Sequence, residues 1–173
     1  RVHLMPNVVD EKRVMLRHFL AAIAYRTQKA IRGCGPGFAA FSAGNKTRTP
    51  AELVMHMASV LGYARTFFTG GEYRPEPLPT LDDELARLHE NLEKLSGHMA
   101  SGDPFIDEMT PERMLHGPLA DAMTHAGQLA LLRRLHGDPV PPENFIYAGI
   151  TPDNLSLDQP SPARPDDEWP ERL

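Results

Sequence analysis

The sequence predicts an all-α four-helix bundle that carries an irregular, proline-rich C-terminal arm. Four segments repeat apolar residues at alternating steps of three and four, which is the spacing of the buried face of an amphipathic helix. From about residue 140 this period ends and prolines follow at Pro141, Pro142, Pro152, Pro160, Pro162, Pro165 and Pro170. A chain of 173 residues can build one sizeable core. We therefore expect residues 1–173 to form a single domain, with about residues 140–173 as a non-helical arm.

The composition narrows the classes of function. A hydrophobic content of 41% and a charged content of 24% are ordinary for a soluble globular protein. The formal net charge of -5 argues against binding to a nucleic-acid backbone, which needs a basic face. No apolar run approaches the length of a membrane span. Cys34 is the only cysteine, so no intramolecular disulfide is expected, and we predict a cytoplasmic protein without nucleic-acid or membrane partners.

The first two helices are predicted over residues 9–32 and 50–68. Asp10 is a suitable cap for the first, and residues 33–37, rich in glycine, end it. The second opens with Thr49, Pro50 and Glu52, which is a capping box with proline at the first helical position. His56 falls on or beside its inward face. A histidine there is more often a hydrogen-bonded core residue than a metal ligand.

The third and fourth helices follow a connector at residues 74–79 that holds three prolines and must be extended. Thr80 caps the third helix, and its apolar stripe runs along Leu81, Leu85, Leu88, Leu92, Leu95 and Met99. His89 and His98 lie off this stripe, so we expect both at the surface. After a short turn at residues 110–115, the last helix is predicted to begin at Pro118 and run to residue 135. Gly127 in its middle predicts a close helix–helix contact.

The last helix also suggests a metal site. Asp121 lies one turn before His125, so their side chains share a face that points at the apolar interior. Buried polar groups need partners, and a metal ion shared with His56 would supply one. Two imidazoles and one carboxylate form a facial triad that suits Zn, Fe or Ni and leaves positions open. A plain Asp–His hydrogen bond is the competing interpretation.

Other residues near this site have weaker signals. A di-iron carboxylate site needs Glu-x-x-His motifs, and Glu52 lies four residues before His56, which is the wrong spacing. Gln128, one turn after His125, is either a hydrogen-bonding neighbour of the metal or a surface residue. Tyr63 and His116 are candidates for a general base, but the sequence identifies no catalytic residue.

Residues 41–56 (FSAGNKTRTPAELVMH), taken with residues 121–128 (DAMTHAGQ), resemble the DinB-like superfamily of DNA-damage-inducible bacterial proteins. The resemblance spans about residues 39–150. It implies a four-helix bundle, usually dimeric, with a metal held by His56 and by the pair Asp121 and His125. Many members have histidine at the first position of that pair. Asp121 is similar to the acidic ligand of the mycothiol-dependent branch. Because this chain has aspartate where many members have histidine, the identity of their metal does not transfer to it.

Two functions are therefore expected as alternatives. Relatives in this superfamily include thiol-dependent S-transferases and mycothiol-dependent maleylpyruvate isomerase. The first alternative is an enzyme in which a divalent ion activates a low-molecular-weight thiol, or water, toward a small-molecule substrate. The second is a non-enzymatic, stress-related binding or scaffold protein with a structural metal or none. Either would be a homodimer if it follows the family.

Overall fold

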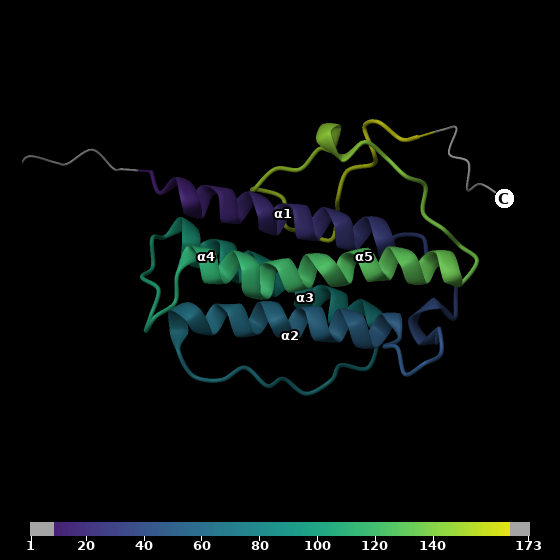
Figure 1. The fold of residues 1–173 in the computed structure, drawn as a ribbon, viewed down its shortest axis with the longest axis horizontal. Coiled ribbons are helices and arrows are strands. Elements are labelled where there is room, and N and C mark those ends of the chain that lie inside the picture. Colours follow the sequence, from purple (N-terminus) through teal and green to yellow (C-terminus); the bar gives the residue numbers. More distant parts are fainter. Residues whose placement is uncertain (1–8, 167–173) are drawn as a thin grey trace, which may run out of the picture.

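The computed structural model describes residues 9–166, and it confirms an all-α four-helix bundle (Figure 1). The long helices are α1 (Glu11–Ile31), α2 (Pro50–Thr69), α3 (Leu81–Ala100) and α5 (Ala120–Leu135). The short α4 (Pro111–Met114) leads into α5. No helix in the described part of the chain is both long and apolar enough to cross a bilayer.

The helices begin where the sequence predicts, because side chains satisfy their free N–H groups. Asp10 accepts a hydrogen bond from the backbone of Arg13 at the start of α1. Thr49 and Glu52 form the reciprocal capping box that opens α2. Thr80 caps α3 in the same way through the backbone of Asp83. The predicted apolar stripes of these helices form the core.

The helices pack as a closed ring in which α2 contacts α3 and α5, and α1 contacts α3 and α5. Helices α2 and α3 run in the same direction, so the connector of residues 70–80 must return along the bundle (Figure 1). A helix of 20 residues is about 30 Å long. An extended connector of this length reaches about 36 Å, which is enough for the return. The three prolines at residues 74–79 keep it extended.

The start of the last helix agrees with the prediction, but a short helical segment leads into it. Helical structure begins at Pro111, capped by Thr110, and continues through a wider turn at Leu115–Leu119 before α5. Gly117 leaves helical geometry there (φ -88°, ψ -105°), so the chain kinks. Pro118 has no N–H to donate and its ring crowds the preceding turn, which is the physical cause of the kink. Gly117 therefore separates this short segment from the last helix, and Pro118 stands at the start of the last helix, as predicted.

The prediction that His89 lies at the surface is wrong, because this residue is only 3% exposed. Nδ1 lies 2.7 Å from the carbonyl oxygen of Leu155 in the arm, and Nε2 lies 2.9 Å from the amide nitrogen of Gln28 on α1. His98 is half-buried, with Nδ1 2.7 Å from Asp103. Helical spacing marks the face toward the bundle axis, but neighbouring segments also cover the flank of α3.

The prediction of close helix packing at Gly127 is also wrong. Gly127 is exposed, and a Cβ atom there would meet nothing within 4 Å. The crowded glycine is Gly62 on α2, where a Cβ atom would lie 2.1 Å from the ring of Tyr73 in the connector. The hydroxyl of Tyr73 accepts a hydrogen bond of 3.0 Å from Asn91 on α3, which fixes the ring in place.

The C-terminal arm is irregular, as predicted, apart from a single turn at Phe145–Tyr147. It lies along α1, on the side of α1 away from α2 (Figure 1). Leu155 and Gln159 are buried, and the guanidinium of Arg32 donates to the carbonyl oxygen of Gln159 over 2.7 Å. Trp169, the one tryptophan of the chain, lies outside the described residues.

Candidate metal centre

The structure brings together the three residues that the sequence proposed as metal ligands. His56 comes from α2, and Asp121 and His125 come from α5. One ligand atom from each lies within 4.8 Å of the other two. The Asp121 carboxylate is 3.2 Å from Nε2 of His125 and 3.6 Å from Nε2 of His56. The two imidazole rings meet edge to face, with centroids 4.8 Å apart.

Local structure explains this convergence. The capping box at Thr49 sets the start of α2, which places His56 two turns into the helix and facing α5. On α5, the four-residue spacing of Asp121 and His125 stacks them on one face. Burial decreases outward from His125, which is buried, through His56, which is half-buried, to Asp121, which is exposed. The group is therefore open to solvent on the Asp121 side.

The hydrogen bond of His125 and the surroundings of His56 both suit metal binding. Nδ1 of His125 lies 2.7 Å from Oε1 of Gln128, so it donates its proton there and leaves Nε2 as the free ligand atom. Burial lowers the pKa of His56, and the nearby charges of Arg48 and His125 lower it further, against the opposing effect of Asp121. His56 is therefore neutral at neutral pH, and the neutral imidazole is the form that binds metals.

The donor set and its spacing are consistent with an ion. Bonds of about 2.0–2.2 Å to nitrogen and oxygen require ligand atoms roughly 3 Å apart. The separations of 3.2 Å from Oδ1 of Asp121 to His125 and of 3.6 Å from its Oδ2 to His56 are close to that requirement, each for a different carboxylate oxygen. The group could hold a metal ion, and the donor types do not identify which one. The same contacts also describe an ion pair between Asp121 and protonated histidine, which is the metal-free interpretation.

The di-iron alternative is not consistent with the structure. Glu52 is exposed, and its carboxylate accepts a hydrogen bond of 2.8 Å from the backbone N–H of Thr49. This carboxylate therefore serves the helix cap. Its place in the first turn of α2 is one turn before His56, so the two do not form the Glu-x-x-His pattern that a di-iron bundle requires.

Cavities lie on both sides of the three candidate ligands. One, of about 500 Å³, is lined by His125, Gln128 and Arg48 among others. The other, of about 520 Å³, is lined by Asp121 together with Tyr63 and His116, the two candidate bases. Both sizes fall in the range of small-molecule sites.

Sequence reasoning missed Arg48 as a neighbour of this site. It comes just before the cap Thr49, and the turn into α2 brings its charge close enough to act on His56. Its place directly before a capping box that leads to a candidate ligand was the available signal.

The chain was also compared with known proteins. No protein-family model, curated protein or solved structure matches it. The resemblance to the DinB-like superfamily therefore stays a prediction from the sequence motifs.

Proposed function

We propose that this protein is a DinB-like, mononuclear metal protein that uses a divalent ion, Zn, Ni or Fe, to act on a small molecule. The observation that supports this most directly is the meeting of His56, Asp121 and His125 from two helices, at a solvent-open point between two cavities. A merely structural ion is normally enclosed by four protein ligands. Three ligands with an open side favour a site that binds water or a substrate.

A bound ion would lower the pKa of a coordinated thiol or water, which makes it a nucleophile at neutral pH. The protein would supply orientation and charge. Gln128 holds His125 in one tautomer, and the carboxylate of Asp121 would offset part of the charge of a bound ion. Tyr63 and His116 offer polar contacts to a small molecule in the cavity beside Asp121.

Metal binding is the first test. Protein purified without added metal, then dialysed against zinc, should hold about one ion per chain, and His125→Ala should hold none. His18 is the matched control because it is an exposed histidine on α1 away from the site; His18→Ala should bind like the wild type. At a free zinc concentration of 100 times Kd, folded-state binding adds about 2.7 kcal/mol of stability, which thermal unfolding will detect. Retention of zinc by His125→Ala would refute the site.

The ion should leave in acid. Both imidazoles must be neutral and Asp121 must be ionised to bind it, so protons replace the metal as the pH falls. The stabilisation by zinc should be fully present above pH about 6.5 and should disappear below it, because that is where a free histidine takes up a proton. Melting curves with and without zinc between pH 5 and 8 measure this. A zinc effect that is constant down to pH 5 would contradict ligation by histidine.

Catalysis is tested separately from binding. Wild type loaded with zinc should speed the reaction of a low-molecular-weight thiol with chlorodinitrobenzene, and a chelator should abolish the increase. Asp121→Asn, which keeps the shape of the side chain and removes its charge, should lower the rate. Zinc binding without any rate increase, with thiol or with an ester as substrate, favours the alternative of a non-enzymatic binding protein.

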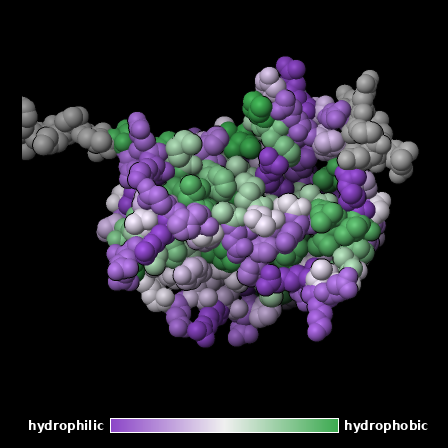
Figure 2. All heavy atoms as spheres, in the orientation of Figure 1, coloured by the Kyte–Doolittle hydropathy of each residue, from purple (hydrophilic) through white to green (hydrophobic). Residues whose placement is uncertain are grey.

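We also propose that the chain forms a homodimer. Leu131 and Leu135 near the end of α5 are 54% and 56% exposed. Figure 2 shows hydrophobic residues gathered over this end of the bundle. An exposed apolar patch of this kind favours a protein partner. Light scattering should give about twice the chain mass of 19.2 kDa at micromolar concentration, and the mass of one chain would contradict the proposal.

A further inference from the structure

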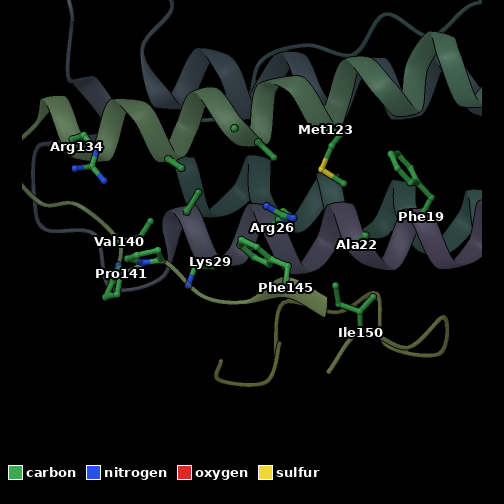
Figure 3. A pocket seen from close by; sticks show the side chains of 15 residues that line it. Phe19, Ala22, Arg26, Lys29, Met123, Arg134, Val140, Pro141, Phe145 and Ile150 are labelled. Carbon is green, nitrogen blue, oxygen red and sulfur yellow. The ribbon is translucent and has the colours of Figure 1, made fainter. Parts of the chain in front are cut away.

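A third cavity lies on the opposite side of α5 from the candidate metal ligands. It is lined by α1, α5 and the C-terminal arm, is open to solvent on one side, and has a volume of about 610 Å³ (Figure 3). Met123, Ala126 and Gly127 line it from α5, whereas Asp121 and His125 point toward α2. This size is typical of sites for small organic molecules.

The wall of the cavity is largely apolar. Its larger apolar side chains are Phe19, Met123, Val140, Pro141, Phe145 and Ile150. Small residues of the two facing helices, including Ala22 and Gly127, leave the space between those helices open. At Gly127 a side chain would meet nothing within 4 Å, so the hollow extends over this residue.

The polar residues in the lining are all cations: Arg26, Lys29 and Arg134. Lys29 is already neutralised, because its ammonium lies 2.9 Å from the buried carboxylate of Glu143. The guanidinium of Arg26 lies 3.2 Å from the centre of the Phe145 ring, and Figure 3 shows it on the side of that ring toward α5. Among residues 9–166 it forms no hydrogen bond or ion pair, although the charge of Glu143 acts on it from farther away. Within the described part of the chain, no aspartate or glutamate lines the cavity.

We propose that this cavity is a second ligand site, which binds an amphipathic monocarboxylate. The alkyl or aryl body of the ligand lies against the apolar wall between α1 and α5. Its carboxylate accepts hydrogen bonds from the guanidinium of Arg26, whose planar face stays on Phe145. A carboxylate matches the fork of donors on arginine, and stacking on Phe145 holds that fork in one orientation before the ligand arrives. An apolar chain alone would cover this cation without pairing it, so the charge selects for an anion.

Decanoate is a suitable probe, titrated calorimetrically below its micelle concentration into the full chain. Saturable binding of one decanoate per chain is expected. Decanol, which has the same chain without the charge, should bind roughly tenfold more weakly, as is usual for the loss of one charge-assisted hydrogen bond. Arg26→Gln should weaken decanoate by a similar factor and leave decanol unchanged. Equal affinity for decanoate and decanol, or no binding of either, would overturn the proposal.

The location is tested by filling the cavity. Gly127→Leu should abolish decanoate binding, because the new side chain enters the hollow. Gly97→Leu is the matched control: Gly97 is also an exposed glycine within a helix, where a Cβ atom would meet nothing within 4 Å, but it lies on α3 outside the cavity. It should bind decanoate like the wild type. His125→Ala should also bind normally, since the metal ligands are on the other face of α5. Unchanged binding by Gly127→Leu would overturn the assignment, because decanoate would then be binding elsewhere on the surface.

Discussion

Replacing Lys29 by methionine should destabilise the protein by about 3–5 kcal/mol, which is the usual cost of removing one partner from a buried ion pair. The side chain of Glu143 is 0% exposed, and the side chain of Lys29 is 11% exposed. They lie 2.9 Å apart and join the C-terminal arm to α1. Methionine keeps most of the apolar stem of lysine, so the change removes the charge with little loss of packing.

Among the described residues, Tyr25 is the group that still hydrogen-bonds the Glu143 side chain after the substitution, and the charge of Arg26 acts on Glu143 from farther away. The hydroxyl of Tyr25 donates to its two carboxylate oxygens, over 3.0 and 2.8 Å. Burial raises the pKa of Tyr25, and the hydrogen bond to Glu143 raises it further, so the hydroxyl stays a donor at all ordinary pH values. One neutral donor does not replace a cation for a carboxylate that has lost its water. The predicted loss therefore follows from the burial of Glu143.

Urea unfolding measures the loss directly, and for a domain of this size it corresponds to about 6–20 °C in melting temperature. Adding Glu143→Gln to Lys29→Met should recover at least half of it, because a neutral amide can still accept from Tyr25. Lys94→Met is the control, since Lys94 pairs with Glu90 on the exposed face of α3 and such pairs contribute little. If Lys29→Met unfolds at the same urea concentration as Lys94→Met, then water reaches Glu143 and the reasoning fails.

Two further predictions concern residues whose surroundings the sequence did not reveal. Gly62→Ala should lower the free energy of unfolding by about 1–3 kcal/mol, because its Cβ atom would lie 2.1 Å from the fixed ring of Tyr73. Gly127→Ala should raise it by about 1 kcal/mol, because alanine has the higher helix propensity. Urea unfolding that shifts both variants in the same direction would contradict this. Burial lowers the pKa of His89 in the folded state. The unfolded chain therefore binds the proton more readily, so the stability due to neutral His89 is fully present above pH about 6.5 and falls by up to about 1.4 kcal/mol per pH unit below it. Unfolding curves between pH 5 and 8 should show a shallower acid loss for His89→Gln than for the wild type, and parallel losses would contradict the assignment.

The sequence by itself determined the helices and their inward faces. Apolar spacing, the threonine caps and the glycine and proline stops are local signals, and a helix needs only local hydrogen bonds. The stacking of Asp121 and His125 is of the same kind, because helical geometry places residues four apart on one face. The meeting of this pair with His56 was predictable for that reason, since all three residues were expected to face one interior.

The tertiary structure decided what covers each remaining surface. His89 is buried because the arm supplies Leu155 and α1 supplies Gln28, neither of which is close to it in sequence. Gly62, and not Gly127, is the crowded glycine because a distant connector packs Tyr73 on α2. The burial of Glu143 and the cavity beside Arg26 likewise need α1 and the arm to meet. Periodicity identifies the face that a helix turns toward the core, but it carries no information about which distant segment will lie on its other faces.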